Sequence, residues 1–257
     1  MEIVLILATI MVLAACVVFG MATKTNVFIL VALTAMLGGA GSVLWHWLYG
    51  VVYADALINL LGDQVPLVAL LGGWVMVFPS LLIFATLRRR FGQISYLQSW
   101  LIALIVFIFF WTIEGIGVQV GLWSYDNEIS AIGVPINVLL ALLHTLNAMI
   151  LLRMLFEYWR VEFVTTLQLP FIWLGLQLLT YGIIGSPYYA MSFLTGSSIM
   201  TAFGLLSTIM LIGWGLHIVM QGLSALQSNQ GGTAYISNFE VLAELDRAER
   251  SDNDLYR

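Results

Sequence analysis

The stretch QSWLIALIVFIFFWTIEGIGVQV, residues 98–120, decides the fold class of this chain. It contains a single charged residue, Glu114, and as a helix it is long enough to cross the hydrocarbon core of a bilayer, which takes about 20 apolar residues. Comparable runs lie at residues 3–23, 27–49, 66–87, 134–155, 163–184 and 197–222. The pattern predicts an all-α integral membrane protein, a bundle of about seven transmembrane helices within residues 1–222.

The composition supports a membrane protein. Hydrophobic residues make up 61% of the chain and charged residues only 9%, whereas soluble domains are about 25% charged. No basic patch is present that would favour nucleic acid as a partner. The one cysteine, Cys16, lies within an apolar run, so an intrachain disulfide is excluded.

The basic residues predict the orientation, because loops that carry Lys and Arg stay in the cytoplasm. With seven spans, one side of the membrane holds every basic residue: Lys24, Arg88, Arg89, Arg90, Arg153, Arg160, Arg247, Arg250 and Arg257. We therefore expect the N-terminus outside and the C-terminus in the cytoplasm. The first segment opens with Glu2 and has no basic start, so we interpret it as a retained helix and not as a signal peptide. A bacterial cell membrane is the expected location.

Two segments fall outside the predicted spans. Residues 51–61 are semi-apolar and too short to cross, which favours an interfacial or re-entrant piece on the outer side. Residues 223–257 form a polar cytoplasmic tail with a possible short helix from Asn238 to Arg250. The tail either binds a cytoplasmic or membrane protein partner or is a solvated end of the chain.

Glu114 is the first candidate for chemistry. An ionisable group inside the bilayer is costly unless it is paired or protonated, so each one is a functional candidate by default. Glu114 lies inside its span, and burial favours the protonated form of a carboxyl group, which suits a proton donor. The alternative is a structural role, in which a protonated or hydrogen-bonded Glu braces two helices.

Two histidines and two asparagines are further candidates. His46 lies near the outer end of its span at a depth similar to Glu114, where an aromatic-belt histidine is the alternative interpretation. His144 lies near the middle of the fifth span, with Asn137 and Asn147 on roughly the same helix face. This polar stripe indicates either a pocket in the bundle interior or hydrogen bonds between helices.

Acidic and aromatic residues gather on the expected outer side. They either are solvated loop residues or close over a pocket above Glu114. The carboxylates are Asp55, Asp63, Asp126 and Glu128, and the aromatic residues are Tyr49, Tyr53, Trp123, Tyr125, Tyr188 and Tyr189.

The region from Glu114 to Pro135 resembles a known family. Glu114 is followed by glycines three and seven residues later, then by Tyr125, and a Gly-Val-Pro at 133–135 opens the next span. This pattern is similar to the carotenoid-biosynthesis membrane family that includes the carotenoid 1,2-hydratases. The residues that match the family pattern are Glu114, Gly117, Gly121, Tyr125, Gly133 and Pro135.

The resemblance implies a membrane enzyme that acts on an isoprenoid or carotenoid by acid-initiated hydration or cyclisation of a double bond. Glu114 would be the acid, and aromatic faces of Trp111, Trp123 and Tyr125 would stabilise the cation. His46 or Asp126 would orient the captured water, and Asn137 and His144 would contact the substrate. No cofactor or metal is expected. The alternatives are a non-catalytic membrane subunit or assembly factor, and a small proton-linked transporter using Glu114.

Overall fold

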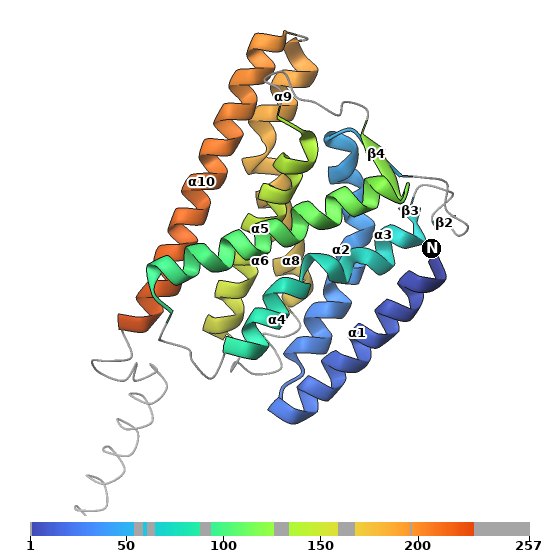
Figure 1. Cartoon of the computed structure of the whole chain (residues 1–257), viewed down its shortest axis with the longest axis vertical. Coiled ribbons are helices and arrows are strands. Elements are labelled where there is room, and N and C mark those ends of the chain that lie inside the picture. Colours follow the sequence, from blue (N-terminus) through green and yellow to red (C-terminus); the bar gives the residue numbers. More distant parts are fainter. Residues whose placement is uncertain are drawn as a thin grey trace, which may run out of the picture.

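The fold is a bundle of helices, seen in a computed structural model that describes residues 2–53, 59–60, 65–87, 94–125, 134–158, 168–195 and 197–228 (Figure 1). The N-terminal helices α1 (Glu2–Thr23) and α2 (Val27–Leu48) are antiparallel neighbours. Their faces are apolar nearly all round, as is typical of helices in lipid. This agrees with the predicted all-α membrane class.

Helix α6 (Ile136–Tyr158) lies at the centre of the bundle. It is packed by α4, α5 and α10 and by the π-helical segment η3. Leu139, Leu140, Leu143 and Leu146 on α6 are almost completely buried. Helix α5 (Tyr96–Gln119) crosses α6 obliquely and brings its C-terminal part against the buried face of α6 (Figure 1).

Four helices in the described residues are long and apolar enough to cross a membrane. These segments are Ile6–Thr23, Tyr96–Gln119, Ile136–Glu157 and Ser198–Ala225. Three further apolar helical stretches are shorter: Val27–Met36, Leu71–Leu87 and Phe171–Ile184. Large apolar side chains such as Phe171, Met210 and Leu194 are exposed on the outside of the bundle, where lipid would cover them. By length and composition, four helices in the part of the chain that the structure describes meet the requirement for a span, fewer than the seven expected.

The expected span 66–87 is an interrupted helix. It consists of α3 (Leu67–Gly72), the 3-10 helix η1 (Gly73–Met76) and α4 (Phe78–Leu87), preceded by the two-residue strand pair of β2 (Asn59–Leu60) and β3 (Val65–Pro66). At the break, a Cβ on Gly73 would lie 2.2 Å from the Ala35 carbonyl oxygen of α2. The backbones therefore meet at a distance that only glycine permits.

The C-terminal part contains two elements that the sequence pattern did not predict. Helix α8 (Leu169–Gln177) continues into η3 (Leu178–Ile184), a π-helix. The short helix α9 (Ser186–Thr195) then packs beside α10 (Ser198–Ser228) where a loop was expected (Figure 1). π-helical turns are rare and occur frequently at functional sites.

A two-stranded antiparallel sheet joins the ends of α2 and α5. Strand β1 (Val51–Tyr53) follows α2, and β4 (Trp123–Tyr125) follows α5. The register pairs Val51 with Tyr125 and Tyr53 with Trp123. The expectation of an interfacial or re-entrant piece at 51–61 missed this strand, while Asp55 and Asp63 lie outside the described residues.

Candidate active site

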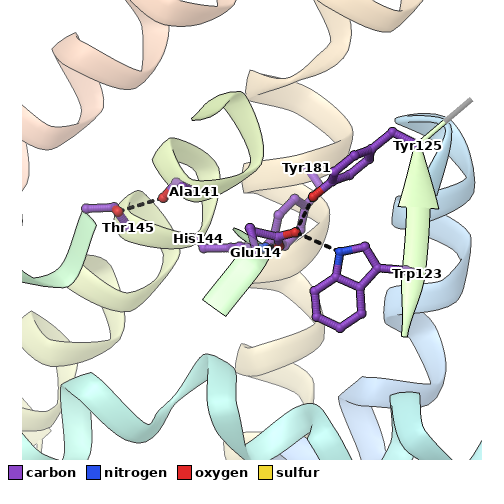
Figure 2. A network of polar contacts seen from close by, with 7 residues as sticks. All are labelled: Glu114, Trp123, Tyr125, Ala141, His144, Thr145 and Tyr181. Atoms are coloured by element: carbon purple, nitrogen blue, oxygen red, sulfur yellow. Dashed lines mark hydrogen bonds and ion pairs between the residues drawn. The ribbon is translucent and has the colours of Figure 1, made fainter. Parts of the chain in front are cut away.

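Glu114 is the centre of a buried polar network at the end of α5 (Figure 2). The residue is 6% exposed. Its Oε2 atom accepts a hydrogen bond from Trp123 Nε1 at 3.2 Å and a second from the Tyr125 hydroxyl. Both donors come from β4, so the strand covers the carboxyl group from the side of the α5 terminus.

A glycine turn at the end of α5 returns the chain to Glu114. Gly121 adopts a positive φ of 70°. Its N–H donates to the Val118 carbonyl, and the N–H of Leu122 donates to the Gly117 carbonyl at 2.8 Å. This is the Schellman arrangement, which reverses the chain after a helix and needs a residue that tolerates the left-handed conformation.

Strand geometry then selects which side chains face Glu114. Successive side chains of a strand point to opposite faces, so Trp123 and Tyr125 share one face and Ser124 points away. Ser124 is exposed, in agreement with this alternation. The Trp123 ring packs on Gly117, where a Cβ would come within 2.0 Å of the indole. The Tyr53 ring of β1 packs on the same indole in an edge-to-face arrangement, with the two ring centroids 6.4 Å apart.

His144 of α6 binds the other carboxyl oxygen. Its Nε2 lies 2.9 Å from Glu114 Oε1, and the two side chains are 1% and 8% exposed. The Phe110 ring, one turn before Glu114 on α5, lies 5.3 Å from the imidazole. Both carboxyl oxygens are thus held by hydrogen-bonding groups, Oε2 by the nearby strand β4 and Oε1 by a residue 30 positions further along the chain.

Tyr181 extends the network on the far side of His144. Its hydroxyl lies 2.5 Å from His144 Nδ1. Tyr181 is part of the π-helix η3, and its backbone carbonyl accepts a hydrogen bond from the Tyr49 hydroxyl at 2.8 Å. Gly185 provides the room, because a Cβ there would overlap the Tyr49 oxygen. The result is a continuous chain from Tyr125 through Glu114 and His144 to Tyr181.

The network can carry one proton between Glu114 and His144. Two states of the pair have no net charge: a carboxylate with an imidazolium, and a carboxylic acid with a neutral imidazole. Burial favours such states over any with net charge. Burial, and secondly the nearby Glu114, raise the pKa of Tyr125 well above its ordinary value, so this hydroxyl keeps its proton and donates.

The structure brings together four of the residues expected at the site: Glu114, Trp123, Tyr125 and His144. Trp111 is 48% exposed and stacks on Phe107, away from these contacts. Asn137 is partly buried in the first turn of α6, two turns before His144, and its Oδ1 has no partner in the described part of the chain. The His46 side chain and Asp126 lie outside the described residues, as do Glu128 and Gly133.

Sequence reasoning placed His144 deeper than Glu114 and did not single out Tyr181. The structure nevertheless brings the two side chains together, because α5 crosses α6 obliquely (Figure 1). Two aromatic residues expected on the outer surface, Tyr49 and Tyr188, are instead buried, and their rings stack with the centroids 6.2 Å apart. The sequence signal that could have identified Tyr181 is its hydroxyl group, which lies inside the apolar run 163–184.

Within the described residues, no group of three or more His, Cys, Asp and Glu side chains is arranged to hold a metal ion. No protein-family model, curated protein or solved structure matches the chain. The fold and the site describe a helical protein that has helices long and apolar enough to cross a membrane and a buried Glu–His–Tyr hydrogen-bond network.

Proposed function

We propose that this chain is an integral membrane enzyme that protonates a double bond of a lipid-soluble isoprenoid at the Glu114–His144 pair. The observation that carries the proposal is the arrangement of donors around the carboxyl group. Oε2 accepts from Trp123 and Tyr125, and Oε1 is paired with His144. Donors fixed around the carboxylate before reaction cost no reorganisation when the proton leaves.

The same arrangement suits protonated Glu114 to act as the proton donor. Hydrogen bonds to a carboxylate stabilise the charged form and so favour release of the proton. Water exclusion, indicated by the 8% exposure of the Glu114 side chain, keeps the proton from being lost to solvent. Protonation of an alkene needs both properties, because an alkene is a weak base and its cation reacts readily with water.

The reaction steps balance for either outcome. The proton bonds to one alkene carbon and leaves a tertiary cation at the other. In hydration, a water oxygen bonds to the cation and the water proton returns to the Glu114–His144 pair. In cyclisation, a second double bond attacks, and loss of a proton to the pair yields an isomer. The rings of Trp123, Tyr125 and Phe110 border the pair, and in the proposed reaction they would stabilise the cation.

We extend the proposal to the topology. The proposal has seven spans: the four long apolar helices, and three more in which the shorter apolar stretches are the central part. The three short stretches span if helix ends and adjoining segments contribute the missing length. With the N-terminus outside, Lys24 and Arg153 fall on the cytoplasmic side, as the positive-inside rule requires.

A proton-linked transporter is the second candidate, and Tyr181 is the observation that favours it. The chain Glu114–His144–Tyr181 joins three helical segments through groups that can each accept and donate a proton. Such carboxylate and histidine chains form proton relays in membrane pumps and carriers. A transporter would move a proton through this chain without changing a lipid-soluble substrate.

Expression in a bacterium that accumulates lycopene tests the enzymatic function. Membrane pigments are analysed by chromatography and mass spectrometry for wild type, Glu114→Gln and Glu157→Gln. Glu157 is a matched control, since it is a half-exposed Glu on α6 whose carboxylate lies 3.9 Å from Arg153. We expect a product that gains one water, or a cyclised isomer, in wild type and Glu157→Gln and its loss in Glu114→Gln.

Full product formation by Glu114→Gln would refute Glu114 as the acid. Unchanged pigment in all three strains would argue against a lycopene-type substrate. Proton uptake by wild-type vesicles with unchanged pigment would favour the transporter. For the subunit alternative, the decisive variant lacks residues 224–257: loss of a co-purifying complex on this deletion, with function retained by Glu114→Gln, would support it.

A further inference from the structure

A second group of buried polar side chains adjoins the inner end of the network. Asn147, Gln177 and Trp173 are each 2–3% exposed. In the part of the chain that the structure describes, hydrogen-bond partners are missing for Asn147 Nδ2, Asn147 Oδ1, Gln177 Oε1 and Trp173 Nε1. Other buried polar side chains in the bundle, such as Ser80 and Thr145, bond to backbone carbonyls.

These side chains share one region between α2, α6 and α8. Trp173, Gln177 and Tyr181 are four residues apart, so they follow one another along one side of α8 and η3. Trp173 Nε1 and Gln177 Nε2 both face Gly38 of α2. A Cβ added to Gly38 would lie 2.3 Å from the Trp173 nitrogen and 3.4 Å from the Gln177 nitrogen. Asn147 lies on α6 three residues after His144, so it shares the helix face of His144, whose Nδ1 is 2.5 Å from the Tyr181 hydroxyl.

Asn147 is the residue in this group whose missing hydrogen bonds need an explanation. Exchanging the oxygen and nitrogen of the Gln177 amide would place the oxygen on the side where the Trp173 N–H lies, and the two groups could then form a hydrogen bond. This exchange would still leave both polar atoms of Asn147 without a partner. Buried polar side chains are nearly always hydrogen-bonded, to protein or to ordered water, and an exception calls for an explanation. The available groups are uncharged and include donors as well as acceptors, which matches water and does not match an ion.

We propose that Asn147, with Tyr181 and Gln177, binds ordered water that continues the Glu114–His144–Tyr181 chain into the middle of the bundle. The water bonds to the Asn147 amide and to the Tyr181 hydroxyl. It thereby connects the Glu114–His144 pair to the interior between α2, α6 and α8. This proposal concerns proton exchange at Glu114 and does not depend on the identity of a substrate.

The test compares Asn147→Leu with Thr145→Val in purified full-length protein. Thr145 is the matched control because its hydroxyl donates to the Ala141 carbonyl of its own helix, as Figure 2 shows. Two quantities are measured: the Tm in detergent, and the rate at which the infrared C=O band of protonated Glu114 shifts in D₂O at acid pH. The band is assigned by its loss in Glu114→Gln.

We expect Asn147→Leu to lower the Tm and to slow the exchange at Glu114 at least several-fold, while Thr145→Val leaves the exchange rate unchanged. A dry, unpaired Asn147 would behave in the opposite way, because replacing it with Leu would relieve the unpaired atoms and raise the Tm. A raised Tm, or an unchanged exchange rate, would overturn the proposal. Gln177→Leu provides the same two measurements if Asn147→Leu does not fold.

Discussion

The Trp123 indole lies directly against the backbone of Gly117, so that a Cβ on Gly117 would come within 2.0 Å of Trp123 Cζ2. The contact holds the indole N–H at 3.2 Å from Glu114. One glycine thus determines whether β4 can reach the carboxyl group.

Gly117→Ala tests this contact. We expect a destabilisation of about 1–3 kcal/mol from overpacking, less the roughly 1 kcal/mol that Ala gains over Gly in a helix. The Trp123 fluorescence should also change as the ring moves. Gly115→Ala is the matched control, since nothing lies within 4 Å of its Cβ position, and it should raise the Tm slightly. Equal effects of the two variants would contradict the packing argument.

Gly121→Ala tests the turn after α5. An Ala at a φ of 70° should cost about 1–2 kcal/mol, because its Cβ crowds the following carbonyl in the left-handed region. Gly121→Asn should recover part of the loss, as Asn tolerates this conformation better than other side chains. The measurement is the Tm of the three proteins in detergent. An Ala variant as stable as wild type would argue against the Schellman turn.

His144→Leu tests the buried pair. Removing one partner of a buried pair is expected to cost about 3–5 kcal/mol, whereas replacing both partners by apolar residues is often close to neutral. The double variant Glu114→Leu with His144→Leu should therefore be more stable than His144→Leu alone. Glu157→Gln breaks an exposed pair and should cost less than about 1 kcal/mol. If the double variant were less stable than His144→Leu alone, the energetic coupling between Glu114 and His144 would be contradicted.

Tyr125→Phe tests the hydrogen bond from β4. Loss of a hydrogen bond to a charged group should cost about 1.5–3 kcal/mol. The control is Tyr96→Phe, which removes a hydroxyl bonded to His217 at 2.8 Å in an exposed position and should have a smaller effect. The comparison of Tm values would fail to support the network if Tyr96→Phe were the more damaging change.

The pH dependence of stability provides a separate test of Tyr125. Its pKa is raised in the folded protein by burial and by Glu114, so the folded state holds the proton more tightly than the unfolded state. Stability from this group is therefore complete below the ordinary tyrosine pKa of about 10 and declines as the pH rises above it. We expect the Tm of wild type to fall more steeply between about pH 10 and pH 12 than that of Tyr125→Phe. Parallel slopes would show that Tyr125 is not the group responsible.

The sequence by itself determined the helical membrane class, since runs of apolar residues longer than the hydrocarbon core allow little else. It also identified Glu114, because a carboxyl group in such a run must be compensated. The turn residues Gly117 and Gly121 and the aromatic Tyr125 were recognisable as a local motif, because the distance between them along the chain is short.

Only the tertiary structure decided which groups compensate Glu114. His144 and Tyr181 are 30 and 67 positions further along the chain, and their approach depends on the crossing of α5 over α6 and on the π-helical turn of η3. Neither feature has a local sequence signal, because both arise from the packing of helices whose faces are almost uniformly apolar. The pairing of β1 with β4, and with it the position of Trp123, was hidden for the same reason: a hydrogen-bond ladder between short segments depends on which helix ends come together in space.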